Sequence, residues 1–205
     1  MESSIHPEHQ ALQIVRDLSR AIHEIVTFAQ ERISADEGNS ASLLVDVAKQ
    51  SVIDGVTCLS RLRSELIRAD GDVESLSTAM NSQSKRHEEW TRIQSSPAMK
   101  DEQAAKKVRE KIELHRANVA ALEAPLALAR TEAELLQTVD RAAANEILIL
   151  ERLATQIAKE VVEPVDSQVR VDAWRDALVR RLIEMDSVVE QVTSAAYDEQ
   201  FHSQK

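Results

Sequence analysis

Glycine, proline, aromatic residues and cysteine are all scarce in this chain of 205 residues, which has three glycines, four prolines, one cysteine and 2% aromatics. So few turn-forming residues argue against a β-rich fold, whereas the runs of Ala, Leu, Glu, Gln and Arg favour long helices. With so few aromatic side chains, the core must be aliphatic. Such a core is typical of helical bundles and coiled coils rather than of enzymes with deep pockets.

Long apolar runs and targeting signals are also missing. The longest apolar candidate is the short ILIL at 147–150, far below the roughly 20 residues that a transmembrane helix needs. The stretch MESSIHPEHQALQIV lacks the basic and apolar regions of a secretory signal. Because the single Cys58 has no disulfide partner within the chain, we predict a cytoplasmic protein.

The sequence offers few signals of catalysis or metal binding. It has no Gly-rich phosphate loop, no cysteine pair with zinc spacing and no Ser, His and Asp set in a strand–turn–helix context. The Glu-x-x-His spacing of Glu199 and His202 lies near the C-terminus, and we expect these residues, with His6 and His9, to be frayed rather than metal ligands. We therefore predict a non-enzymatic protein with no catalytic residue, metal or cofactor.

Four segments show the apolar periodicity of helices. The first begins at Pro7 and ends before ADEGNS, and the second covers 41–95 and passes through Gly71 without losing its phase. A third follows SSP and ends at EVVEPVD, and a fourth follows Pro164. In the second and third segments, the apolar positions alternate three and four residues apart, which predicts paired helices with left-handed supercoiling.

The lengths of these segments suggest how they pair. A turn at Ser95-Ser96-Pro97 would place Val73 beside Val119 or Ala120, and Leu66 beside Leu126. Both flanking helices would then end at the level of Gly71 and Pro125. We therefore predict an all-α protein: an antiparallel four-helix bundle (1–70 plus 126–205) with a protruding two-helix antiparallel coiled-coil arm (71–125), whose tip lies near 95–97.

Cations gather around the predicted tip although the formal net charge is −10. Residues 80–120 contain nine Lys and Arg against six Asp and Glu, a local charge of +3 that leaves −13 for the remainder. An anionic partner could be bound there with the repelling charge held away. The candidate partner-binding residues are Lys85, Arg86, Trp90, Arg92, Lys100, Lys106, Lys107, Arg109 and Lys111.

A simpler interpretation is a solvated coiled-coil surface, in which Lys and Glu pair at i and i+4, as in EKIELHR, and Trp90 fills the end of the arm. The functional hypothesis is a structural or adaptor protein that binds other proteins, with acidic surfaces, through helical faces and the basic tip. A homodimer is a further candidate assembly. The alternative is a peripheral binder of membrane surfaces or nucleic acid through the same cations, for which steep salt dependence is expected.

Overall fold

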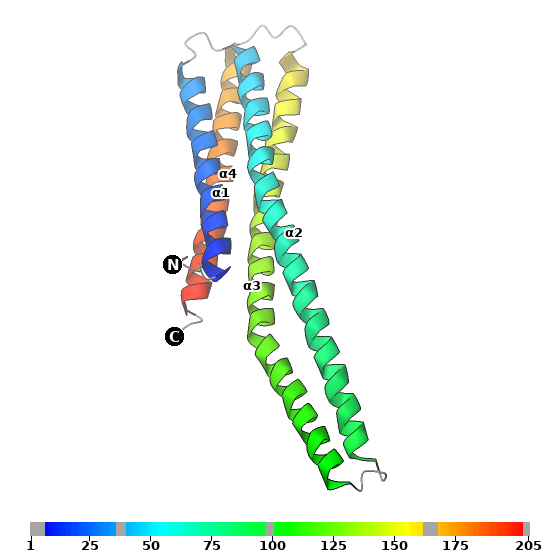
Figure 1. The fold of residues 1–205 in the computed structure, drawn as a ribbon. Coiled ribbons are helices and arrows are strands. Elements are labelled where there is room, and N and C mark those ends of the chain that lie inside the picture. Colours follow the sequence, from blue (N-terminus) through cyan, green and yellow to red (C-terminus); the bar gives the residue numbers. More distant parts are fainter. Residues whose placement is uncertain (1–6, 36–39, 97–100, 162–167, 203–205) are drawn as a thin grey trace, which may run out of the picture. The chain divides into compact units, whose positions relative to one another are not determined.

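Four α-helices account for nearly all of the described chain in the computed structural model, which covers residues 7–35, 40–96, 101–161 and 168–202 (Figure 1). The helices are α1 (Pro7–Ala35), α2 (Ala41–Gln94), α3 (Glu102–Val161) and α4 (Gln168–His202). Within these ranges there is no strand, and the all-α class is confirmed. The contacts divide the chain into two compact units: unit 1 (Met1–Glu65 with Leu135–Lys205) and unit 2 (Leu66–Glu134).

The starts of the helices follow from local chemistry. Pro7 is the first residue of α1, where its missing N–H has no intrahelical acceptor in any case. At the start of α2, the Leu43 N–H donates a hydrogen bond to Ser40 Oγ over 3.4 Å, and at the start of α3 the Gln103 N–H donates one to Asp101 Oδ1 over 3.0 Å. Both side chains cap backbone donors that the first turn leaves unpaired.

Gly71 and Pro125 both lie inside continuous helices. The prediction of one helix over 41–95 is confirmed, because α2 runs through Gly71 from Ala41 to Gln94. Pro125 is an exposed residue within α3. Every predicted seam position of α2 and α3 is buried or half-buried, including Gln83, His115 and Asp140.

The predicted register between α2 and α3 is wrong by about two helical turns. Instead of a contact between Leu66 and Leu126, Arg68 forms an ion pair with Glu132, and Gln83 bonds to His115. The cause is the connection between the helices. The last turn of α2 extends to Ser96, whose N–H donates to the Ile93 carbonyl over 3.1 Å, and α3 does not begin until its cap at Asp101.

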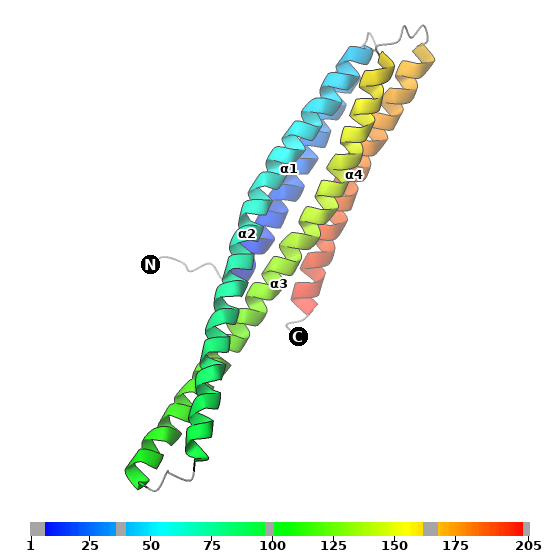
Figure 2. The same ribbon diagram turned by 90° about the vertical axis from the view of Figure 1, so that its right-hand side faces the viewer.

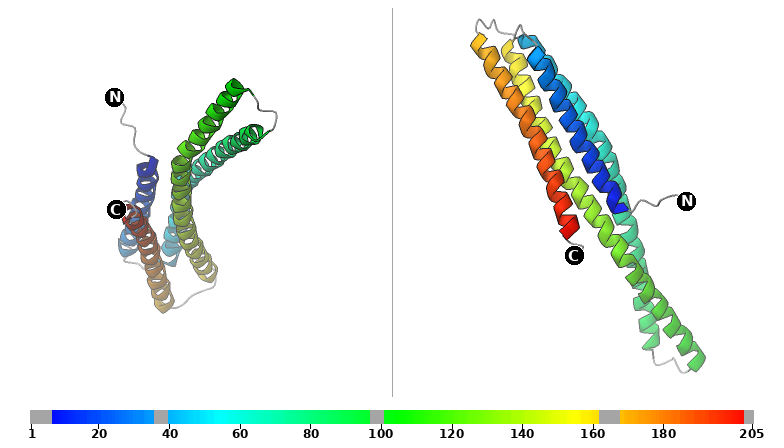
Figure 3. Two further views of the ribbon diagram at one scale, coloured as in Figure 1. Left: turned by 90° about the horizontal axis from the view of Figure 1, so that it is seen from below. Right: turned by 90° about the vertical axis from the view of Figure 1, so that its left-hand side faces the viewer.

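Unit 1 has the character of a helical bundle, to which all four helices contribute (Figures 1 and 3). Aliphatic side chains from each of them are buried in its interior. Here the helices bury more than one row of residues: Leu44 and Val47 in α2, and Val139 in α3, are buried beside the predicted seams. Gly55 allows α2 to approach α3 closely, since a Cβ at this position would lie only 2.9 Å from Ile147 Cδ1.

In unit 2, the remaining segments of α2 and α3 lie side by side (Figure 2). Few of its residues are fully buried, and they follow the seam: Ala69, Val108, His115, Leu126, Ala129 and Ala133, with Glu132 beside them. A single row of buried residues is what two paired helices can cover. Among the described residues, no helix combines the length and the apolar character that crossing a lipid bilayer requires.

Candidate functional site

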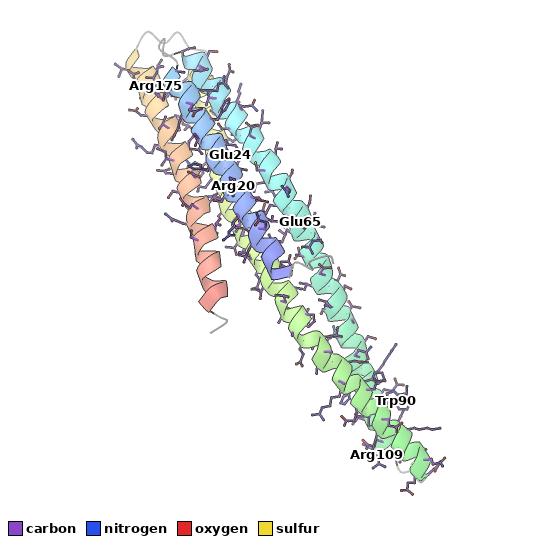
Figure 4. The ribbon with its side chains drawn as sticks, turned by 60° about the vertical axis from the view of Figure 1, so that its left-hand side comes forward. Arg20, Glu24, Glu65, Trp90, Arg109 and Arg175 are labelled. Atoms are coloured by element: carbon purple, nitrogen blue, oxygen red, sulfur yellow. The ribbon has the colours of Figure 1, made fainter. Side chains whose placement is uncertain are left out.

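All the described candidate cations belong to unit 2 and are exposed to solvent. Those on α2 are Lys85, Arg86 and Arg92, and those on α3 are Lys106, Lys107, Arg109 and Lys111. Figure 4 shows Arg109 on α3 and Trp90 on α2 in this part of unit 2. The ninth candidate, Lys100, lies outside the described residues.

Most of these cations have no carboxylate partner among the described residues. Of the seven described, Arg92 alone forms an ion pair within the described ranges, with its Nη2 4.0 Å from Glu88 Oε2. The pairs at i and i+4 that the simpler interpretation expects in EKIELHR do not occur among the described helices. The remaining positive charges are therefore free to meet an anionic group from another molecule.

The ion pair between Arg68 and Glu132 shows which positions of the two helices share a side. If the seam residues are labelled a and d, Arg68 is at position c of its heptad and Glu132 is at position g. Their contact of 2.8 Å places positions c and g of both helices on one side of the pair. Positions b and e of both helices therefore lie on the opposite side.

This division sorts the cations into two groups. Between residues 82 and 118, Arg86, Lys107 and Lys111 lie on the side of positions c and g, which we call the c/g side, together with one described carboxylate, Glu89. Within the same stretch, the described residues of the opposite b/e side include three cations and three carboxylates: Lys106, Arg109 and Arg116, with Glu88, Glu102 and Glu113. The net positive charge is thus concentrated on the c/g side, while Lys85 and Arg92 occupy the outer position f of α2.

Apolar side chains are exposed on the same c/g side. Ile93 is 36% exposed at position g of α2, and Leu114 is 48% exposed at position c of α3. Trp90 lies at seam position d and is half-buried. The c/g side therefore offers apolar surface next to unpaired cations.

The polar residues of the seam bond to one another across the helices. His115 Nδ1 lies 2.8 Å from Gln83 Oε1, and Asn118 Nδ2 donates a hydrogen bond to the same oxygen over 3.4 Å. His87 Nδ1 is 3.3 Å from the Ile112 carbonyl oxygen, to which it can donate. These contacts satisfy polar groups inside the seam, which supports a structural role for both histidines.

Sequence reasoning missed two half-buried ion pairs. Glu132, which is 6% exposed, meets Arg68, and Glu146, which is 7% exposed, meets Arg181 of α4. The signal that could have found them is a glutamate at heptad position g, directly beside the seam, which Glu132 and Glu146 share. Such a carboxylate needs a cation from a neighbouring helix, because its burial would otherwise be costly.

Unit 1 also contains a groove between α1 and α4. Its volume is about 510 Å³, and its lining includes Arg16, Arg20, His23, Asp186 and Glu190 (Figure 4 labels Arg20). His23 Nδ1 and Asp186 Oδ2 are 2.8 Å apart across the two helices. This hydrogen bond is the main cause of the raised pKa of His23, and the negative charge of Asp186 adds to it.

No three His, Cys, Asp or Glu side chains among the described residues come close enough to hold a metal ion. His6 lies outside the described residues, as do the side chains of His9, Glu199 and His202. Burial raises the pKa of the Cys58 thiol, with smaller contributions from Asp54 and Glu24, so the thiol stays protonated at neutral pH.

Comparisons of this chain with protein families, with curated proteins and with solved structures find no match.

Proposed function

We propose that this protein is a non-enzymatic adaptor that binds an acidic surface of another protein through the basic residues of unit 2. The observation that carries the proposal is the set of exposed cations that have no carboxylate partner in the described part of the chain, although the formal net charge is −10. A chain with this net charge repels most acidic partners, so a local excess of cations selects both the docking surface and its orientation.

The proposal includes a finer description of the two units. Unit 1 is an antiparallel four-helix bundle that supplies a stable body, and unit 2 is an antiparallel two-helix coiled coil that presents the cations. The polar residues of its seam and the small number of buried side chains support this division of roles. With a single, half-buried cysteine, the protein suits the cytoplasm.

Binding through these cations would be weak to moderate and sensitive to salt. Exposed ion pairs each contribute at most about 1 kcal/mol, so several must act together. The Debye length falls from about 14 Å at 50 mM salt to about 6 Å at 300 mM salt, which weakens attraction between exposed charges. The adaptor function therefore predicts partner binding that declines steeply over this range.

A second candidate is binding to an anionic membrane surface. Ile93 and Leu114 are exposed beside Arg86, Lys107 and Lys111, and apolar side chains among cations also suit the boundary between headgroups and acyl chains. Nucleic acid offers no comparable site for the apolar side chains. It is therefore a control in the experiment rather than a candidate of equal weight.

The test is a binding titration of the full chain against three labelled probes: poly-L-glutamate, phosphatidylcholine vesicles containing phosphatidylserine, and a DNA duplex. We expect binding to poly-L-glutamate at about 50 mM salt and at least a tenfold loss at about 300 mM salt. Replacing Arg86, Lys107 and Lys111 by Glu should abolish it without reducing helicity. Preference for vesicles would support the membrane alternative, and failure to bind all three probes would refute a role for the cations. Light scattering on the same samples tests the homodimer.

A further inference from the structure

The c/g side of unit 2 has a repeating arrangement along the helix axis that goes beyond a collection of cations. The pairing of His115 with Gln83 places the neighbouring Leu114 at the level of Ser84 on α2. Ile93 lies nine residues further along α2, which corresponds to about 13 Å at 1.5 Å per residue. The two exposed apolar side chains are therefore separated by about two and a half helical turns.

The three cations of this side lie between the two apolar residues. Arg86 follows shortly after the level of Leu114, and by the same register Lys111 and Lys107 fall at successive levels before Ile93. Glu89 is the one carboxylate among them, and small or uncharged residues occupy the other c and g positions here: Ser82, Ala104 and Asn118. The order along the axis is thus apolar, basic, apolar.

From this order we infer that the partner segment is an amphipathic acidic α-helix that lies along the c/g side of unit 2. Its apolar residues would be spaced i and i+8, about 12 Å apart, which matches the separation of Leu114 and Ile93 to within about 2 Å. Carboxylates one turn from each apolar residue would face Arg86, Lys107 and Lys111. The small residues Ser82 and Ala104 leave room for a helix backbone to approach.

The inference rests on the proposed function, because it names the partner of the same basic residues. It adds one requirement that charge alone does not impose: the apolar side chains must be covered in the complex. An anchor of two aliphatic residues and three cations is small, so we expect a transient complex with a dissociation constant in the micromolar range.

The experiment uses a labelled helical peptide of about 18 residues, with leucines at i and i+8 and glutamates one turn from each, titrated with the full chain and followed by fluorescence anisotropy. A second peptide of the same net charge carries serines in place of the leucines. We expect the leucine peptide to bind at least tenfold more tightly. Replacing Ile93 and Leu114 by Ser should remove this advantage while leaving poly-L-glutamate binding unchanged.

Matched charge-reversal variants test which side of unit 2 binds the peptide. Replacing Arg86, Lys107 and Lys111 by Glu should abolish peptide binding. The same change at Lys106, Arg109 and Arg116, on the b/e side, should reduce it less than about threefold, because those cations lie on the side away from the peptide. Far-UV circular dichroism of each variant verifies that the helices persist.

Three results would overturn the inference. Equal binding of the leucine and serine peptides would show that only charge is recognised, in which case poly-L-glutamate binding would still support the proposed function. An equal effect of the two charge reversals would show that no side is preferred. If phosphatidylserine vesicles displace the peptide and bind more tightly than it does, the apolar and basic residues serve a membrane surface instead.

Discussion

Replacing Gly55 or Gly71 of α2 by alanine should change the free energy of unfolding in opposite directions, because α2 approaches α3 closely at Gly55. At Gly55, a Cβ would lie 2.9 Å from Ile147 Cδ1 and 3.1 Å from Ile147 Cγ1. At Gly71, a Cβ would meet nothing within 4 Å. Both glycines lie in α2, so both gain the same intrinsic helix propensity on replacement, and only their surroundings differ.

The gain in helix propensity and the cost of overpacking together decide whether each substitution stabilises the protein. Alanine stabilises a helix interior by about 1 kcal/mol relative to glycine. At Gly71 nothing opposes this gain, and we expect the free energy of unfolding to rise by about that amount. At Gly55 the new methyl group must displace Ile147, which is 4% exposed, and overpacking of this kind costs about 1–3 kcal/mol. Gly55→Ala should therefore lose about 1 kcal/mol overall.

Urea denaturation followed by far-UV circular dichroism measures both changes, with thermal melts as a second assay. A change of 1 kcal/mol shifts the melting temperature by about 2–4 °C in a chain of this size. Ile147→Val removes the nearest atom of the clash and should couple favourably with Gly55→Ala in a double-mutant cycle, by about 1 kcal/mol. If Gly55→Ala stabilises the protein as much as Gly71→Ala does, the helices do not approach closely there and the packing argument fails.

Three further changes test other parts of the fold. Pro125→Ala should raise the free energy of unfolding by up to about 3 kcal/mol, because proline lacks the amide donor of a helix interior; a lower melting temperature would contradict a continuous α3. Arg181→Ala should cost about 3 kcal/mol in urea denaturation, because it leaves the buried Glu146 without its cation, and no loss would show that the pair is dispensable. The raised pKa of His23 beside Asp186 means that this pair stabilises the fold fully below pH 6.5 and loses that effect as the pH rises through the folded-state pKa. His23→Asn should make the free energy of unfolding less dependent on pH in this range. An unchanged pH dependence would contradict the stabilising role of the pair.

The seams of α2 and α3 were predictable because burial in paired helices repeats every three and four residues regardless of the partner. Gly71 illustrates the strength of this signal: the phase of the apolar positions continues through it, and so does the helix. Local sequence propensity alone would have predicted a turn at ADGD, residues 69–72. Tertiary packing along the rest of the seam compensates for the roughly 1 kcal/mol that one glycine costs.

The register was not predictable from the same pattern, because moving one helix by a whole heptad leaves the seam unchanged. The length of the connection decides between such registers, and here it depended on which residue caps α3. Ser96 and Asp101 are both reasonable caps by residue type, and only the structure shows that Asp101 is used. This difference of five residues accounts for most of the displacement of α3 and changes every cross-helix pair.

The polar residues inside the seam explain how one register can be preferred over its neighbours. Gln83 and His115 satisfy each other only when they are at the same level, and a shift of one heptad would bury both without a partner. Arg68 and Glu132 impose the same condition further along the helices. The register in turn determines that Leu114 and Ile93 lie on either side of the three cations. The binding surface on the c/g side therefore depends on polar contacts inside the seam, which stabilise unit 2 less than apolar residues would but fix which side chains face the partner.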